Sequence, residues 1–401
     1  MRYKWLVLWL IAGPMISGAA PFAPDSEGLQ NARRHFLDAN VNVLTFHSID
    51  SLFLTRRVDN SGTVWALPRS AAKPDFTYQY AGKDYSALDV LDRTFANALI
   101  ILKHGAIVYE VYRNQTDATS HFISFSMAKS ITSILIGIAL TDGQIHSLDD
   151  QITQYVPELK DSAYDGVTIR QAMDMRSGAN YVEQYVVDHP DILAAAFEDS
   201  MVENRMRFVS IARAMTRAYP PGEHFSYSTF ESCVLGWVLE RATKQSITHY
   251  TSERLWKPAG MESYGFWMVD GPPDVGREFN GGGFNAVARD YARIGLMMLH
   301  NGKAGDRQIV PAAWVKESTV PRVREPASPA DPTLGYHYQW WPLVDSDAYM
   351  ALGLQGQMIY VDPASDTVVV KLSSVPPGNR DAFNESMAFM RAASRWQVPA
   401  K

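Results

Sequence analysis

The 401-residue chain predicts an α+β fold, in which a central antiparallel sheet is flanked by helices and interrupted by a helical insertion. Residues 98–112 form two apolar runs around Lys103-His104-Gly105, which is a hairpin pattern. Residues 353–372 hold a second pair of apolar runs, separated by a Pro/Ser/Asp turn. Nearly everything between these hairpins has helical or loop patterns. We therefore expect one sheet, with a cleft where the insertion meets it.

The first twenty residues have the pattern of a secretory signal. Arg2 and Lys4 precede an apolar stretch at residues 5–12, and small residues follow up to Ala20. The apolar stretch is too short to span a membrane. We expect cleavage near residue 20 and an exported protein, periplasmic or extracellular, without a stable membrane partner. The alternative is an uncleaved N-terminal anchor.

Residues 21–75 are rich in turn-forming residues and predict an extension that wraps the main domain. The predicted division continues with a sheet domain at 76–142 and 227–401 and a mainly helical domain at 143–226. Loss of the two basic signal residues takes the formal net charge from −6 to −8, and no basic run remains. This charge pattern argues against nucleic acid as a partner.

The residues after Phe125 predict a buried helix whose first turn carries a candidate serine nucleophile and a candidate lysine base. Ser126 and Lys129 are three apart and share a helix face, so the lysine can reach the serine oxygen. Apolar residues recur with helical spacing up to Ala139, which predicts one strongly buried face, and Asp142-Gly143 supplies a stop. A desolvated lysine loses its proton more easily and can then act as a base for a serine nucleophile. The alternative is a capping serine followed by a solvated lysine.

Two further segments can complete such a site. A polar turn at residues 220–229 contains Tyr227 just before a second helical pattern, and residues 353–363 form a strand that opens with glycine. Cys233 lies within the apolar positions of that second helix and predicts a small buried hydrophobe. The ten histidines show no ligand spacing, so we expect no metal and no cofactor.

The order and local sequence of these motifs resemble the class C β-lactamase and penicillin-binding type of serine hydrolase, most closely the 6-aminohexanoate-dimer hydrolase branch. The resemblance runs from about Leu88 to the C-terminus, with a weaker match at residues 48–58. It is carried by SMAKS, LTDGQIHSLDDQITQYVPEL, MRSGANYVEQY, PPGEHFSYS, GGGFNAVARDYARIGLMML and GLQGQMIYVDP. It implies a β-lactamase/transpeptidase-like fold.

The resemblance also implies roles for single residues. Ser126 matches the acylated nucleophile, Lys129 its proton acceptor and Tyr227 the tyrosine that passes protons to the leaving group. The backbone N–H groups of Ser126 and of Gln357, the residue after Gly356, match the oxyanion hole.

The tyrosine that touches the substrate amide in the amide-hydrolysing branch matches Tyr185, and Gly356 belongs to the substrate-binding edge. Two positions depart from the β-lactamase pattern. β-Lactamases have a Tyr-x-Asn motif, and Thr229 stands at the position of its asparagine. They also have a Lys-Thr-Gly motif, and Leu354 stands at the position of its lysine.

These residues predict an exported enzyme that hydrolyses a small-molecule amide or ester through an acyl-enzyme. A D-Ala-D-Ala peptidase or β-lactamase is a second interpretation, against which the missing cation counts. A third is a penicillin-binding-like module that has lost catalysis. The natural substrate does not follow from the sequence, because this scaffold carries several hydrolytic activities.

Overall fold

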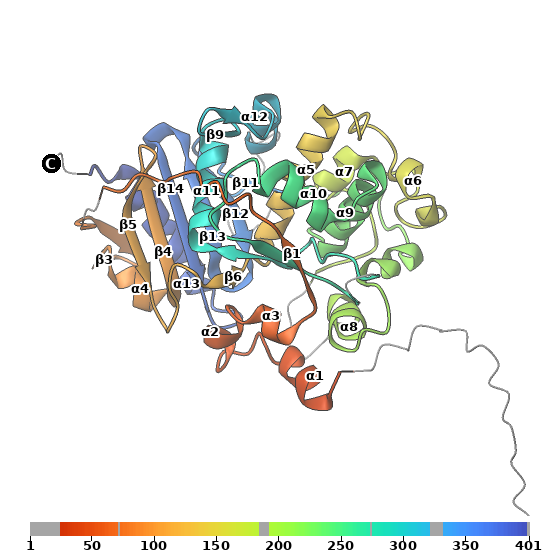
Figure 1. Cartoon of the computed structure of the whole chain (residues 1–401), viewed down its shortest axis with the longest axis horizontal. Helices are drawn as coiled ribbons and strands as arrows, with labels where there is room; N and C mark the ends of the chain where they lie inside the picture. The colour runs from red at the N-terminus through yellow and green to blue at the C-terminus, as the bar shows by residue number, and fades with distance from the viewer. Residues whose placement is uncertain (1–24, 71–72, 184–191, 273–274, 321–331, 399–401) are drawn as a thin grey trace, which may run out of the picture.

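The computed structural model describes residues 25–70, 73–183, 192–272, 275–320 and 332–398. Its largest sheet has six antiparallel strands in the order β11-β12-β13-β14-β4-β5 (Figure 1). In that order, the strands are β11 (Trp341–Pro342), β12 (Tyr349–Gly353), β13 (Gln357–Asp362), β14 (Thr367–Ser373), β4 (Ala96–Lys103) and β5 (Ala106–Tyr112). The two predicted hairpins therefore join in one sheet, because β14 pairs with β4. The predicted α+β fold is confirmed.

The turns of these hairpins follow from local chemistry. His104 and Gly105 both have positive φ, which suits a two-residue hairpin turn between right-twisted strands. The run expected as one strand from Gly353 instead bends, because residues 354–356 form a 3₁₀ turn between β12 and β13. This bend places Leu354, Gln355 and Gly356 at the end of the sheet.

Side chains alternate between the two faces of the sheet, as a period of two requires. Val368 and Val370 pack toward α11 (Ala288–Leu299), whereas Val369 packs toward α13 (Arg380–Arg395). Figure 1 shows these helices on opposite faces of the sheet. Both faces are covered here, and every residue of β4, β13 and β14 is buried.

A second sheet has four strands in the order β1-β7-β8-β6. These strands are β1 (Thr55–Val58), β7 (Gly265–Met268), β8 (Phe284–Val287) and β6 (His121–Ile123). The expectation that residues between the hairpins are nearly all helix or loop is wrong here. The strands β7 and β8 are four residues long and fully buried, so neither shows the alternation that marks a strand in a sequence.

The remaining strands form two small hairpins, β2 (Thr77–Tyr80) with β3 (Lys83–Ser86) and β9 (Lys303–Ala304) with β10 (Arg307–Gln308). The other α-helices are α1 (Glu27–Arg34), α2 (Asn42–Thr45), α3 (Ile49–Leu52), α4 (Asp89–Arg93), α5 (Met127–Thr141), α6 (Ile152–Tyr155), α7 (Ile169–Met173), α8 (Ile192–Phe197), α9 (Thr229–Thr243), α10 (Ile247–Thr251) and α12 (Ala312–Thr319). Among the described residues, no helix combines the length and apolar character needed to cross a membrane.

The helix α5 is the centre of the molecule. Residues 127–139 are all buried, so the expected single buried face is wrong and the helix is enclosed on every side. It contacts α9 on one side and β12 on another. The Thr132 hydroxyl donates to the Ala128 carbonyl within the helix at 3.1 Å, whereas the buried Ser133 hydroxyl has no hydrogen-bond partner among the described residues.

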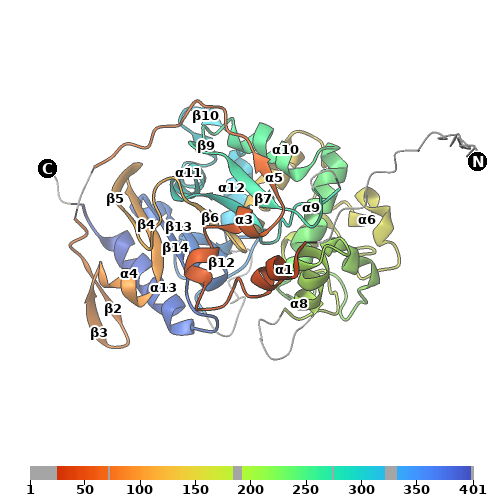
Figure 2. The ribbon, with the colours of Figure 1, turned by 60° about the horizontal axis from the view of Figure 1, so that its bottom comes forward.

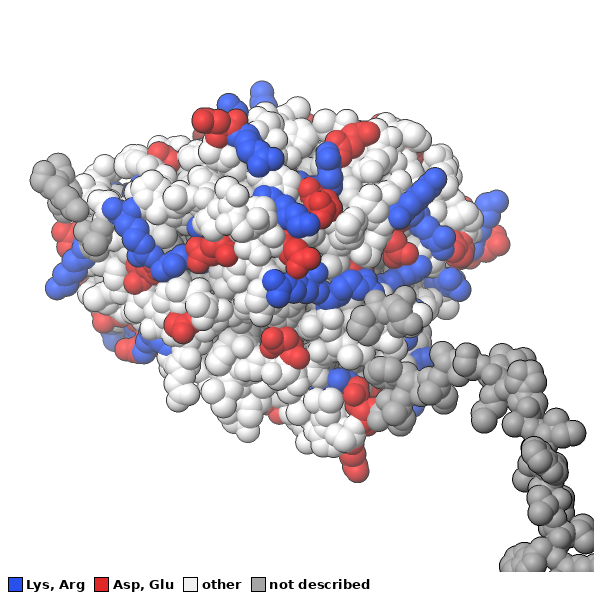
Figure 3. Space-filling model, in the orientation of Figure 1, with Lys and Arg blue, Asp and Glu red and all other residues white. Residues whose placement is uncertain are grey.

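The N-terminal segment, residues 25–58, lies across the boundary between the large sheet and the helices. Figure 2 shows α1 and α3 in front of this boundary, close to α8. Asn42 anchors the segment, since its buried side chain donates to Gln355 Oε1 at 2.7 Å and to the Ser374 carbonyl at 3.2 Å. On the face drawn in Figure 3, basic and acidic side chains are intermingled.

Candidate active site

Ser126 stands at the start of α5 on a strained turn. The preceding residue, Phe125, has a φ of +43°, a conformation that is uncommon for side-chain-bearing residues and often marks functional sites. Ser126 occupies the N-cap position, but its side chain makes no capping hydrogen bond. The hydroxyl is therefore available for other partners, and the capping interpretation is wrong.

Lys129 meets that hydroxyl from within the core. Its side chain is 1% exposed, and Nζ lies 3.0 Å from Ser126 Oγ, 3.0 Å from Thr229 Oγ1 and 2.6 Å from the Gly281 carbonyl. An ammonium group would donate to all three acceptors, whereas a neutral amine would donate to two and accept the Ser126 proton. Burial lowers the pKa of Lys129, which favours the neutral amine.

Thr229 and Glu183 extend this contact into a network. The Thr229 hydroxyl donates to Glu183 Oε1 at 2.9 Å, and the Thr229 backbone N–H donates to the same carboxylate. The negative charge of Glu183 raises the pKa of Lys129 and so opposes part of the effect of burial. Thr229 therefore contacts Lys129 where the family pattern has an asparagine. The sequence carried no signal for Glu183 beyond its place in MRSGANYVEQY.

Gly281 contributes its carbonyl because its backbone comes close to α9. A Cβ atom at this position would lie 2.8 Å from Thr229 Cγ2 and 3.3 Å from Cys233 Sγ. Any larger residue would push the carbonyl away from Lys129. The triple glycine at residues 281–283 was the available signal, since such runs indicate close backbone approach.

Cys233 is buried in the apolar surroundings that the sequence predicted. Burial raises the pKa of its thiol to about 12, so the thiol stays protonated at neutral pH. No cluster of three or more His, Cys, Asp or Glu side chains suited to a metal ion occurs within the described ranges.

Tyr227 lies beside both Ser126 and Lys129. Its ring centroid is 5.0 Å from Lys129 Nζ, and the ring packs against Trp341 at 5.6 Å and Tyr336 at 5.9 Å. Burial raises the pKa of the Tyr227 phenol far above its usual range, and hydrogen bonding to Ser126 opposes that rise. The phenol is therefore a proton donor at neutral pH. Tyr336 and Trp341 pack against its ring and fix its position.

The end of strand β12 lies close to the backbone just before Ser126. A Cβ atom at Gly353 would lie 2.2 Å from the Ser124 carbonyl, so only glycine permits this approach. Gly353, Leu354 and Gly356 line the same cavity as Ser126. Gln357 lies one strand further, is 1% exposed and binds Ser373 through its side chain.

The oxyanion assignment to the N–H groups of Ser126 and Gln357 stays a prediction. Gly356 lies in the cavity wall, as the sequence analysis expected of a substrate-binding residue. Tyr185 lies outside the described residues.

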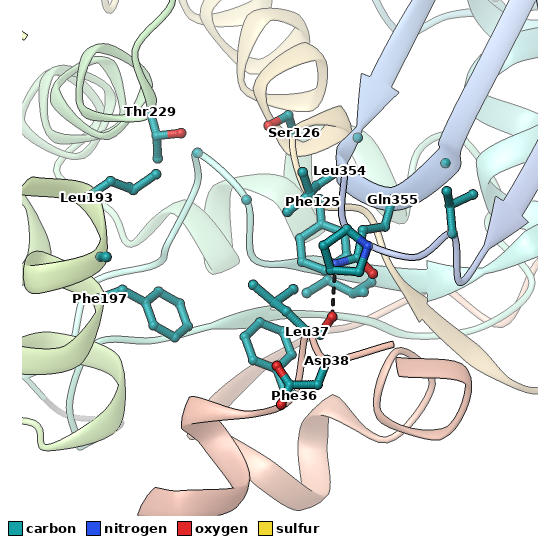
Figure 4. A pocket seen from close by; sticks show the side chains of 18 of the residues that line it. Phe36, Leu37, Asp38, Phe125, Ser126, Leu193, Phe197, Thr229, Leu354 and Gln355 are labelled. Atoms are coloured by element: carbon teal, nitrogen blue, oxygen red, sulfur yellow. Dashed lines mark hydrogen bonds between the residues drawn. The ribbon is translucent and has the colours of Figure 1, made fainter. Parts of the chain in front are cut away.

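A cavity of about 640 Å³, here called the chamber, opens beside Ser126 (Figure 4). Its volume falls within the roughly 300–1,000 Å³ of typical small-molecule sites. Figure 4 shows its walls coming from three directions: Leu193 and Phe197 from α8, Phe36 and Leu37 from the N-terminal segment, and Leu354 from the sheet. The sequence analysis missed the first two walls, because neither carries a motif.

Comparison with known proteins agrees with this arrangement. Residues 93–389 match the family model described as Beta-lactamase. The 6-aminohexanoate-dimer hydrolase of Paenarthrobacter ureafaciens is 29% identical over 299 residues, which cover 71% of this chain and 74% of that protein.

Among solved structures, a Bacillus anthracis protein assigned to the 6-aminohexanoate-dimer hydrolases superimposes with a TM-score of 0.81 at 26% identity. The match covers 93% of this chain and 98% of that one. A family VIII carboxylesterase shares the fold alone, with a TM-score of 0.56 at 14% identity over 82% of this chain and 99% of that one.

Proposed function

The chain belongs to the β-lactamase family of serine hydrolases, and from this premise we propose that Ser126 is the nucleophile of an enzyme that hydrolyses small amides or esters through an acyl-enzyme. One observation carries the proposal. Lys129 Nζ lies 3.0 Å from Ser126 Oγ at a position where burial lowers the pKa of the amine. A neutral amine at hydrogen-bond distance is what a serine hydroxyl needs to become a nucleophile.

The proposed reaction uses the groups around Ser126 in sequence. Lys129 takes the hydroxyl proton as Ser126 attacks the carbonyl carbon, and the backbone N–H groups of Ser126 and Gln357 stabilise the oxyanion. Tyr227 then protonates the leaving amine or alcohol, and Lys129 returns a proton to Tyr227. Water reverses these steps to release the acid. Each oxyanion donor contributes about 3–4 kcal/mol, so the N–H groups matter as much as the base.

The relatives support amides and esters as the substrate class. The relative from Paenarthrobacter is named as a hydrolase of 6-aminohexanoate dimer, which is a linear amide, and the carboxylesterase neighbour acts on esters. A D-Ala-D-Ala peptidase or β-lactamase is the second candidate. Leu354 at the chamber wall counts against it, because a carboxylate-bearing substrate needs a cation there. An inactive module would not be expected to keep Ser126, Lys129 and Tyr227 together.

We also propose that the enzyme is exported and acts in the periplasm or outside the cell. The support is the basic, apolar and small-residue order of the first twenty residues. N-terminal sequencing of the mature protein would test this, and a start near residue 21 is the expected result.

Covalent labelling separates the three functional candidates. The purified protein is treated with a fluorophosphonate or with penicillin, and intact mass and peptide mapping locate the adduct. Labelling of Ser126 by the fluorophosphonate alone is expected of an esterase or amidase. Labelling by both reagents would indicate a peptidase, and labelling by neither would indicate a binding module.

A further inference from the structure

The chamber beside Ser126 has an apolar interior. Phe36 and Leu37 from the N-terminal segment line it together with Leu193 and Phe197 from α8 (Figure 4). Phe36 and Phe197 stack with their ring centroids 5.8 Å apart. Phe36 also packs within 6.2 Å of Phe125, the residue before Ser126. We call these four residues the apolar wall.

Among the charged residues that line the chamber, Arg33 is buried, whereas Arg34, Asp38 and Arg380 are exposed. Arg33 donates to the Val202 carbonyl at 3.1 Å and to Asp25 at 2.6 Å, while Arg34 pairs with Glu198. A charged group placed among the apolar side chains would lose its hydration, and Arg33 and Arg34 already have carboxylate partners. The chamber therefore favours an uncharged occupant.

The chamber lies on one side of Ser126. Its lining includes Ser126, Thr229 and Leu354, but it does not include Tyr227. In the proposed reaction the leaving group has to reach Tyr227 to be protonated. The part of the substrate that occupies the chamber is therefore the acyl group.

We propose that the apolar wall binds an uncharged, apolar acyl chain of the substrate, so that the N-terminal segment acts as a specificity element of the site. This inference rests on the proposed function and deepens it. Phe36, Leu37, Leu193 and Phe197 are its specificity-determining residues. The wall is part of the fold, because Gln355 Nε2 donates to the Leu37 carbonyl at 3.0 Å and Asn42 donates to Gln355.

The first test uses a series of p-nitrophenyl esters with acetyl, butanoyl, hexanoyl and octanoyl groups, which share one leaving group. For the wild-type enzyme, kcat/KM is expected to rise roughly three- to fourfold per methylene until the chamber is full. A 6-aminohexanoyl ester and an adipoyl monoester, which carry a charge at the chain end, are expected to react more slowly than the hexanoyl ester. A flat length profile, or a preference for either charged chain, would overturn the inference.

The second test narrows the chamber. Leu193→Trp is expected to reduce the ratio of octanoyl to acetyl turnover about tenfold, because the larger ring occupies space that the chain would fill. Ile192→Trp is the matched control, since Ile192 is the neighbouring residue on α8, is 46% exposed and does not line the chamber. This control is expected to leave the ratio unchanged.

The outcomes keep the two proposals apart. If no ester is hydrolysed and no fluorophosphonate labels Ser126, the proposed function fails. If acetyl ester is hydrolysed but Leu193→Trp and Ile192→Trp have the same length profile as wild type, the function stands and the acyl assignment is wrong. Retained acetyl turnover in Leu193→Trp also shows that the variant is folded.

Discussion

The two sides of Ser126 differ in the contacts that they offer, since one side is a hydrogen-bonded polar network and the other is an apolar wall. On one side Lys129, Thr229, Glu183 and the Gly281 carbonyl form a polar network in which each group contacts the next within hydrogen-bond distance. On the other side the apolar wall has no hydrogen bond to offer and defines a shape. The comparison indicates that the proposed chemistry depends on single atoms of the network, whereas selection of the acyl group depends on volume.

The largest effect is expected from Ser126→Ala, which removes the proposed nucleophile. Acyl-enzyme formation should disappear, as measured by intact mass after a slow ester substrate. The melting temperature should change little, because the Ser126 side chain makes no capping hydrogen bond that alanine would lose. A covalent adduct that persists in Ser126→Ala would remove this serine from the mechanism.

Replacing Lys129 should cost nearly as much. Lys129→Arg keeps the charge, but a guanidinium cannot accept a proton below a pH of about 12 and has no space at a 1% exposed position. We expect turnover to fall about 10²–10⁴-fold, as for loss of a general base, and to a similar extent in Lys129→Met. Rates near wild type for the arginine variant would mean that Lys129 acts only through its charge.

Tyr227→Phe deletes one hydroxyl and keeps the ring that Tyr336 and Trp341 hold. Amide hydrolysis should fall about 10²–10⁴-fold, with about 1 kcal/mol of stability lost. The loss should be smaller for p-nitrophenyl esters, because nitrophenolate departs without a proton. Equal losses on amides and activated esters would contradict protonation of the leaving group by Tyr227.

Local geometry predicts contacts only between residues that are close along the chain. Ser126 and Lys129 are one helical turn apart, so local helix geometry sufficed to bring them together. Lys129 and Gly281 are separated by 152 residues and Glu183 and Thr229 by 46, and no local pattern encodes such contacts. Only the fold brings these residues together.

The apolar wall was unpredictable for a different reason. Phe36, Leu37, Leu193 and Phe197 are apolar residues in short helices or turns, where they are indistinguishable from core residues by composition. The sheet was predictable because β4, β5, β13 and β14 are long apolar strands with clear turns, whereas β7 and β8 are too short and too buried to show a period.

The pH dependence of kcat/KM in Glu183→Gln tests whether Glu183 acts on the pKa of Lys129. The proposed base has to be neutral, so kcat/KM should fall as the pH drops through the pKa of Lys129. The carboxylate of Glu183 raises that pKa, and its replacement by a neutral amide should therefore move the acidic limb of the profile to lower pH. Thr229→Ser, which keeps the hydroxyl between the two residues, should leave the limb in place. A limb that moves to higher pH in Glu183→Gln would contradict this electrostatic role.

The smallest effect is expected where the N-terminal segment meets the turn at residues 354–356. Asn42→Ala removes the donor to Gln355 Oε1 at 2.7 Å and to the Ser374 carbonyl at 3.2 Å, within a site that is 1% exposed. Leaving these buried acceptors without partners should cost about 1–3 kcal/mol of stability. Gln355 shares its turn with Leu354 and Gly356 at the chamber wall, so kcat/KM should fall by less than about tenfold. The fall should be larger for octanoyl than for acetyl esters, because the apolar wall loosens before the polar network does. Asn40→Ala, at an exposed position of the same segment, is the control and should behave as wild type. A uniform loss across all acyl lengths in Asn42→Ala would mean that the turn supports the polar network rather than the apolar wall.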